Sequence, residues 1–358
     1  MEGEVDLQEQ HLAPSALVRS ILRQDSVASV LQRCRTCCAA SALARELGGL
    51  AALAHLPPAA YGARVVDALR GELSQHCGCG QSALEELYGF LGALKPEGGV
   101  RFFCGSASWA VRSSSSFSDV SQRLWPALHA LVDSAARYDF LFRGRAALEL
   151  GSGTGIAGLV LSDILPLRSL ELTDGDPVAV AQLLESAKSR ARRPRVSPRG
   201  RPGGEGELAA ELAASGLRWG ELAESADLVD AVRSRATAFI ASDVTYDLSI
   251  ASTLATALRL LLQTRTPSSP SPVPVCETAG LVSLLCADPT ARFMLLASTV
   301  RDSDTQAVFA DRFAENGLRS FELCDCEAGD GVLDSGPMLD KAAVSLVVHE
   351  SLLGQGSP

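Results

Sequence analysis

Residues 147–155 read Ala-Leu-Glu-Leu-Gly-Ser-Gly-Thr-Gly, a mostly apolar run that ends in three alternating glycines. Glycine adopts positive φ angles without strain and lets a ligand lie against the backbone. A helix that begins directly after such a turn points free N–H groups at the ligand. The stretch therefore predicts a strand, a ligand-binding turn and a helix, where the ligand is a nucleotide phosphate or an amino-acid carboxylate.

The segments around this stretch alternate between strand-like and helix-like patterns. We expect strands at 146–150, 169–173, 217–219, 237–244, 292–299, 320–324 and 343–349, and helices at 121–138, 156–165 and 177–189. Alternation of this kind predicts an α/β fold with a mostly parallel, seven-stranded sheet and helices on both faces.

The chain is expected to contain two domains. Residues 1–97 predict a helical amino-terminal region, because Leu, Ala and Val recur there at three- and four-residue spacings. Residues 98–355 predict the α/β domain, which opens with a hairpin of β-favouring residues. Two insertions, near 190–207 and 264–274, are rich in Arg, Pro, Gly, Ser or Thr and are expected to be mobile loops. The arginines of the first insertion form a basic patch, which suits either a solvated loop or an acidic partner or RNA.

Composition narrows the class of protein. The 358 residues carry a net charge of −10, which argues against broad nucleic-acid binding. No apolar run is long enough to span a membrane, and the acidic start Met1–Asp6 is unlike a signal peptide. We therefore expect a cytoplasmic protein that binds neither membranes nor nucleic acid directly, and a monomer.

Ten cysteines do not predict a metal centre. Cys34 and Cys37 have zinc-ligand spacing, but the second pair, Cys77 and Cys79, is a C-x-C and not the C-x-x-C of a zinc ribbon. Buried or surface thiols are the simpler interpretation, and no metal site is expected.

The glycines alone do not decide the ligand. Counted from Gly153, the stretch Gly153–Gly158 fits the G-x-G-x-x-G pattern of dinucleotide-binding proteins, although this register starts three residues after the strand. Asp174 follows the next strand at the spacing at which a carboxylate accepts hydrogen bonds from a ribose, with Asp176 as the alternative. Because a dinucleotide and a nucleoside cofactor both carry a ribose, a dehydrogenase stays open at this point.

Three further motifs accompany the glycines. Leu217-Arg218-Trp219-Gly220 lies near the end of one expected strand, and Asp243-Val244-Thr245-Tyr246 follows another. Leu124-Trp125-Pro126 begins the helix before the first strand of the sheet. The second motif lies at the carboxyl end of a central strand, where open α/β sheets place their binding sites.

With Glu149 before the glycines, these motifs resemble the seven-strand protein-lysine methyltransferase family, whose marks are L-x-W-G and D-x-x-Y. The likeness extends to Ala83–Tyr88 and to Ala297–Thr305. It implies a Rossmann-like, seven-stranded class I methyltransferase sheet and an enzyme that methylates protein lysines with S-adenosyl-L-methionine. Within the family, the likeness is greatest to enzymes that methylate elongation factor 2, so elongation factor 2 is the expected substrate.

The resemblance also implies a set of site residues. The expected cofactor-binding residues are Trp125, Glu149, Gly151, Ser152, Gly153, Gly155, Asp174, Trp219 and Ser242. Glu149 would lie near the methionyl amine, Trp219 would stack on adenine and Trp125 would close over the methionyl part. Arg218 departs from the family pattern, which has an acidic residue there to contact the adenine edge.

We expect Asp243 and Tyr246 to be the catalytic residues. The Asp243 carboxylate would accept an N–H bond from the substrate lysine, and Tyr246 would pack against the amine or hydrogen-bond to it. Two other functions stay open: a methyltransferase for another protein or a small molecule, and a non-catalytic module that binds S-adenosylmethionine. The fold alone does not separate these functions.

Overall fold

The computed structural model describes residues 127–189, 209–263, 278–299, 303–323 and 342–353, the two strands at 98–104 and 107–113, and separate helical positions between 21 and 69. The chain divides into two compact units, residues 1–112 and 113–358. The two predicted insertions, 190–207 and 264–274, lie outside the described residues.

In the first unit, β1 (Gly98–Cys104) and β2 (Ala107–Ser113) pair in a two-stranded sheet. This pairing confirms the predicted hairpin. The described helical positions include buried apolar side chains such as Leu43, Leu47 and Leu69. The predicted domain boundary at residues 97 and 98 stays a prediction, and the contacts divide the chain after Arg112.

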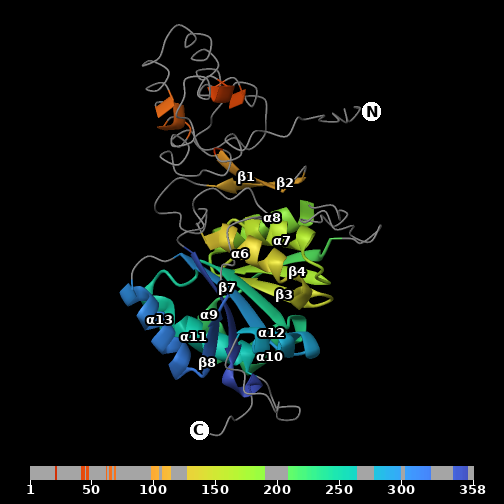
Figure 1. Ribbon diagram of the computed structural model, residues 1–358, viewed down its shortest axis with the longest axis vertical. Helices are drawn as coiled ribbons and strands as arrows, with labels where there is room; N and C mark the ends of the chain where they lie inside the picture. Colours follow the sequence, from red (N-terminus) through yellow and green to blue (C-terminus); the bar gives the residue numbers. More distant parts are fainter. Residues whose placement is uncertain are drawn as a thin grey trace. The chain divides into compact units, whose positions relative to one another are not determined.

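The second unit is built on a seven-stranded sheet (Figure 1). Its strands are β3 (Ala146–Leu150), β4 (Ser169–Asp174), β5 (Glu211–Gly216), β6 (Ala238–Ser242), β7 (Phe293–Thr299), β8 (Leu318–Glu322) and β9 (Ala342–His349). They lie in the order β5-β4-β3-β6-β7-β9-β8. Strands β3 to β7 pair in parallel, whereas β9 is antiparallel to both β7 and β8. The predicted fold, a Rossmann-like methyltransferase sheet, is confirmed.

One predicted strand was wrong. The third strand was expected at 217–219, but the structure places it at β5 (Glu211–Gly216), and Trp219 begins the helix that follows. The sequence Glu-Leu-Ala-Ala-Ser-Gly has little β propensity and forms a partly exposed edge strand. Its pairing with β4, in the register Ser169↔Glu211, decides its conformation.

Helices cover both faces of the sheet (Figure 1). They are α6 (Ala127–Arg137), α7 (Ile156–Ile164), α8 (Pro177–Ser189), α9 (Trp219–Glu224), α10 (Ala226–Arg235), α11 (Ala251–Leu262), α12 (Thr278–Ala287) and α13 (Ser303–Glu315), with short 3-10 turns η3 (Asp139–Phe142), η4 (Leu248–Ile250) and η6 (Glu350–Leu352). Helices α6, α7 and α8 pack on one face and α9, α10, α11 and α13 on the other. The layers place the carboxyl ends of β3, β4, β6 and β7 along one edge.

A buried arginine makes hydrogen bonds at the opposite side of the sheet, where the parallel strand β3 begins. Arg145, directly before β3, donates hydrogen bonds to four backbone carbonyls that follow or end α12: those of Leu285, Asp288, Pro289 and Ala291. Its guanidinium also lies over the ring of Phe293, 5.3 Å from the centroid. Burial lowers the pKa of Arg145, and the neighbouring Asp288 carboxylate opposes that shift.

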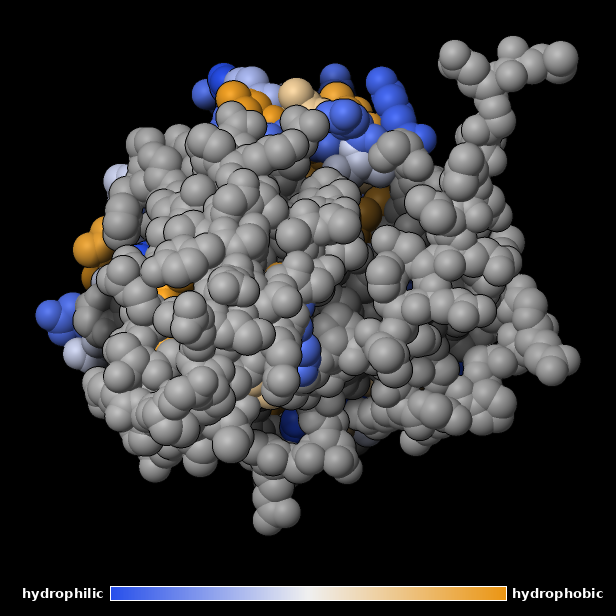
Figure 2. Space-filling model, turned by 90° about the horizontal axis from the view of Figure 1, so that it is seen from above, coloured by the Kyte–Doolittle hydropathy of each residue, from blue (hydrophilic) through white to orange (hydrophobic). Residues whose placement is uncertain are grey.

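No helix among the described residues is long and apolar enough to cross a membrane. The large apolar side chains most exposed in this part of the chain are Phe140, Val178, Tyr246 and Leu248. Figure 2 shows hydrophobic and hydrophilic residues interleaved on the visible part of the described surface. Two of these four apolar residues, Tyr246 and Leu248, follow β6 at the carboxyl edge of the sheet.

Candidate functional site

The glycine loop (Gly151–Gly155) joins β3 to α7, as the sequence predicts. All three of its glycines have positive φ angles, and Gly155 forms the amino-terminal cap of α7. The loop is held to the end of β4: the N–H of Ser152 donates to the carbonyl of Thr173 at 2.9 Å, and the N–H of Thr173 donates to Ser152 Oγ at 3.1 Å. These contacts fix a strand–turn–helix unit of the kind that binds ligands.

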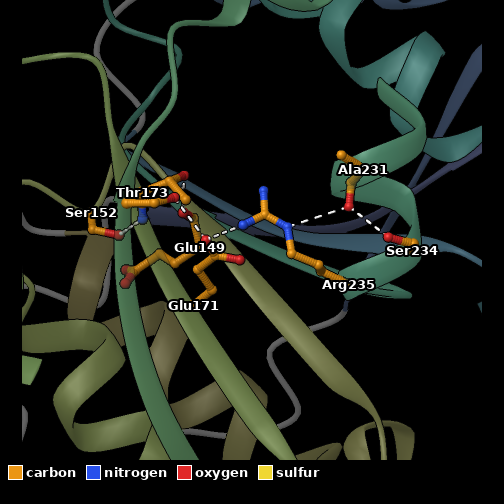
Figure 3. A network of polar contacts seen from close by, with 8 residues as sticks. Glu149, Ser152, Glu171, Thr173, Ala231, Ser234 and Arg235 are labelled. Carbon is orange, nitrogen blue, oxygen red and sulfur yellow. Dashed lines mark hydrogen bonds and ion pairs between the residues drawn. The ribbon is translucent and has the colours of Figure 1, made fainter. Parts of the chain in front are cut away.

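Glu149 lies inside this unit and is only 2% exposed. Burial raises the pKa of its carboxyl to about 8; the neighbouring Asp174 adds to the shift, and a hydrogen bond from Ser152 opposes it. Figure 3 shows its side chain turned away from Arg235, which instead pairs with Glu171 at 2.6 Å. Glu149 is therefore a buried acid without a described cation beside it.

Asp174 closes the glycine loop onto the end of β4. Its Oδ2 accepts a hydrogen bond from the N–H of Gly153 at 2.8 Å, and its Oδ1 accepts one from the N–H of Asp176 at 2.9 Å. Asp176 in turn accepts from the N–H of Val178 in the first turn of α8. The half-buried Asp174 can accept further hydrogen bonds beside the glycine loop. Asp176, in contrast, accepts a hydrogen bond from the first turn of α8.

Trp219 lies directly against the glycine loop. A Cβ at Gly151 would lie 3.5 Å from Trp219 Cζ2 and 2.9 Å from Val244 Cγ1, so only glycine allows this close approach. Trp219 is partly buried and packs against the hydrophobic core that contains Leu217 and Val244. The adjacent Arg218 is exposed and donates to the carbonyl of Gly175 at 3.5 Å. The indole thus lies beside the glycine loop, and its stacking on adenine stays a prediction.

Two buried polar atoms of the site have no hydrogen-bond partner within the described part of the chain: Glu149 Oε2 and Ser242 Oγ. In the register of the sheet, Glu149 pairs with Ile240, and Ser242 lies two residues further along the same face of β6. Buried polar atoms nearly always have partners in native proteins. Two such oxygens on neighbouring strands fit a ligand that donates hydrogen bonds, such as an ammonium group.

The Asp243–Tyr246 turn begins with a strained residue. Asp243 has a φ of 53°, the only positive φ of a non-glycine residue in the described ranges. It is 5% exposed, and its carboxylate accepts hydrogen bonds from the N–H and hydroxyl of Thr299 at 2.8 and 2.7 Å and from the N–H of Ala127 at 3.3 Å. The carboxylate of Asp243, a predicted catalytic residue, is thus buried and accepts hydrogen bonds from groups of the protein itself.

Tyr246, the other predicted catalytic residue, is 40% exposed at the end of the same turn. Thr245 donates to Ser298 Oγ on β7 at 2.7 Å. Leu248, 50% exposed, follows in η4. The structure therefore brings Tyr246 to an accessible position in the turn that follows β6, at the carboxyl edge of the sheet.

A cavity of about 170 Å³ adjoins this turn between α13 and strands β7, β8 and β9. Apolar and uncharged polar side chains line it: Thr245, Leu296, Ser298, Thr299, Thr305, Gln306, Phe309, Ala310, Phe313, Ser320, Ala343 and Ser345. The lining carries no charged side chain, so the cavity suits uncharged groups.

Several predicted features fall outside the described residues, namely Trp125 and the cysteines at 34, 37, 77 and 79. Within the ranges that are described, no cluster of His, Cys, Asp and Glu could hold a metal ion. The sequence motifs give Thr299 no role, although Thr299 lies in the segment Ala297–Thr305 that resembles the family. The partners of Asp243 emerge only from the fold.

Part of the chain matches a known protein family. Residues 113–269 match the family model described as lysine methyltransferase, a range that contains Glu149, Asp174, Trp219 and Asp243. An uncharacterized protein of Dictyostelium discoideum is 34% identical over 73 residues, so the match spans only 20% of either protein.

Solved structures show weaker likeness. N-methyltransferase NodS from Bradyrhizobium japonicum WM9 is 9% identical, with 62% of this chain and 96% of that chain covered and a TM-score of 0.34. Precorrin-6y C5,15-methyltransferase from Geobacter metallireducens GS-15 is also 9% identical, with coverages of 66% and 93% and a TM-score of 0.35. Likeness this low carries no argument about function.

The strand order and the family match support a methyltransferase that uses S-adenosylmethionine. Dinucleotide-binding sheets have the order 3-2-1-4-5-6 with parallel strands. Here the antiparallel β9 lies between β7 and β8, which departs from that pattern. The predicted cofactor, S-adenosylmethionine, is confirmed as the methyl donor that the family and fold imply.

Proposed function

We propose that this chain transfers a methyl group from S-adenosylmethionine to a lysine side chain of a protein. The observation that carries the proposal is the position of the Asp243–Tyr246 turn. It follows β6, next to the strand that leads into the glycine loop, within the range that matches the lysine methyltransferase model. The exposed Tyr246 then lies at the edge of the sheet where a second substrate would meet the cofactor.

The cofactor site would use four described side chains. Glu149 and Ser242 would each offer an oxygen that has no partner among the described residues to the methionyl ammonium, which can donate up to three hydrogen bonds. Asp174 accepts from the ribose hydroxyls, and Trp219 stacks on the adenine. Trp125 remains a predicted contact to the methionyl part.

When bound, the cofactor would supply an electrophilic methyl group on a positively charged sulfur, which a neutral amine could accept while the sulfur kept the electron pair of the broken bond. A lysine amine has a pKa of about 10.4, so roughly one in a thousand is neutral near pH 7.4. The nearby sulfonium charge favours the neutral form. The remaining work of the chain is alignment, which supplies much of the rate in such reactions. Tyr246 would contact the amine and orient it.

The substrate proposed is a protein, and elongation factor 2 in particular, on the strength of the sequence motifs. Tyr246 and Leu248 place two exposed apolar side chains near the end of β6, and Thr245 of the same turn lines the uncharged cavity. A macromolecular substrate would cover such side chains, whereas a small metabolite would not reach beyond the turn.

The test is transfer of a labelled methyl group. The purified chain is incubated with labelled S-adenosylmethionine and cell extract, and separately with purified elongation factor 2, and the modified residues are identified by mass spectrometry. We expect methylated lysine in elongation factor 2. Label in a different protein would refute elongation factor 2 as substrate, and label on a small molecule or on no acceptor would refute protein-lysine methylation.

A further inference from the structure

The Asp243–Tyr246 turn is joined to the end of β7 by four hydrogen bonds. The N–H of Asp243 donates to the carbonyl of Ala297 at 2.8 Å, and Thr245 Oγ1 donates to Ser298 Oγ at 2.7 Å. The N–H and the hydroxyl of Thr299 donate to the two oxygens of the Asp243 carboxylate at 2.8 and 2.7 Å. Three successive residues of β7 therefore hold the turn.

The same carboxylate reaches a third segment. Its Oδ2 accepts the N–H of Ala127, the first residue of α6, at 3.3 Å. Amino-terminal N–H groups of a helix lack partners within the helix, and a carboxylate there is favoured by the helix dipole. Asp243 thus fastens together the turn after β6, the end of β7 and the start of α6.

The hydrogen bonds of Asp243 are better suited to holding these three segments together than to binding a substrate amine directly. A carboxylate offers about four acceptor positions, and the three hydrogen bonds from Thr299 and Ala127 use most of them. The residue is 5% exposed. Its left-handed backbone conformation is one that Asp and Asn tolerate better than most residues. Such strain persists only where surrounding contacts hold it.

Resting on the proposed function, we infer that Thr299 and Asp243 form a latch that positions Tyr246 for methyl transfer. Thr299 is a positioning residue: its hydroxyl and N–H hold the Asp243 carboxylate, which sets the path of the chain toward Tyr246 three residues later. Asp243 acts through the same contacts. Neither residue needs to touch the substrate lysine.

The test compares two changes at one position in the full chain. Thr299→Val keeps the shape and the N–H but removes the hydroxyl, whereas Thr299→Ser keeps the hydroxyl. Thr278→Val is a matched control, because the Thr278 hydroxyl donates to the carbonyl of Glu322, away from the turn. Asp243→Asn is a second variant, since Asn also tolerates the left-handed conformation.

Three quantities are measured well below the unfolding temperature: hydrogen–deuterium exchange of the peptide covering 243–250, kcat for the protein substrate, and the Kd for S-adenosylmethionine. Thr299→Val should speed exchange in that peptide and lower kcat by roughly tenfold or more, as loss of a hydrogen bond to a charged group predicts. The Kd should stay within about twofold. Thr299→Ser should restore exchange and kcat, Asp243→Asn should behave like Thr299→Val, and Thr278→Val should change none of the three quantities.

Other results would contradict the proposed positioning role of Thr299 and Asp243. Unchanged exchange in Thr299→Val means that the hydroxyl does not hold the turn. Faster exchange with an unchanged kcat means that the turn does not position the reacting groups. Equal losses of cofactor affinity and kcat indicate general damage. If the wild-type chain methylates no lysine, the proposed function fails, and exchange alone then decides whether Thr299 holds the turn.

Discussion

The buried Glu149 should make the stability of the protein fall as pH rises. Its carboxyl has a pKa of about 8 in the folded chain, chiefly because of burial, against an ordinary value of 4.5. The unfolded chain loses this proton near pH 4.5, and the folded chain keeps it until about pH 8. The contribution to stability is therefore fully present below pH 4.5 and is lost as pH rises toward 8.

The size of this effect follows from the two pKa values. Each pH unit between them removes about 1.4 kcal/mol from the free energy of unfolding. Near pH 8 the slope levels off, because about half of the folded molecules are then ionised at Glu149. Between pH 6 and pH 8 the loss sums to about 2 kcal/mol.

The assay is urea unfolding of the wild-type chain and of Glu149→Gln at pH 6, 7 and 8. Glutamine has the size of the protonated acid and does not titrate, so the variant should lack this loss. His349 also titrates in the range: burial lowers its pKa, so its contribution is present above pH 6.5 and is lost as pH falls through the lowered pKa. His349 is present in both proteins, so its effect cancels in the difference. Equal pH dependence in the two proteins would refute the assignment of a buried, neutral Glu149.

Three further predictions concern other parts of the second unit. Arg145→Met should lower the free energy of unfolding by about 3 kcal/mol, because four buried or partly buried carbonyls lose their donor; calorimetric melting checks this, and an unchanged Tm would contradict it. Gly158→Ala should destabilise by about 2 kcal/mol, since its Cβ would lie 2.1 Å from Leu172 Cδ2 and 2.7 Å from Glu149 Oε2; a loss below 0.5 kcal/mol in urea unfolding would count against the packing described. Leu248→Ala should raise KM for the protein substrate about threefold or more with the Kd for S-adenosylmethionine unchanged, whereas Phe140→Ala, an exposed apolar control, should leave both unchanged; equal effects of the two changes would argue against substrate contact at Leu248.

Much of the sheet was predictable from two patterns: β3 and β7 are mostly apolar runs, whereas apolar and polar residues alternate along β4. The predicted 146–150 and 169–173 agree with β3 and β4 to within one residue. β5 was misplaced because its sequence suits a helix as well as an edge strand, and only pairing with β4 determines it. The strand was predicted at Leu217–Trp219 instead, because these residues are bulkier than those of β5.

The glycine loop and its neighbours were predictable for a related reason. Glu149, Gly151 and Asp174 lie at fixed spacings from strand ends, so their positions follow once the strands are known. The contacts of Asp243 were not predictable, because Thr299 is distant in the sequence and Ala127 more so. A left-handed φ at Asp243 also leaves no local mark in the sequence.

Calorimetric titration of the full chain with S-adenosylmethionine and with NAD tests most directly whether the glycine loop belongs to a methyltransferase. The buried Glu149, the Ser242 hydroxyl, which has no hydrogen-bond partner among the described residues, and the Trp219 ring beside Gly151 predict binding of S-adenosylmethionine, weakened in Glu149→Gln, and no comparable binding of NAD. Preference for NAD, or no binding of S-adenosylmethionine, would contradict the account.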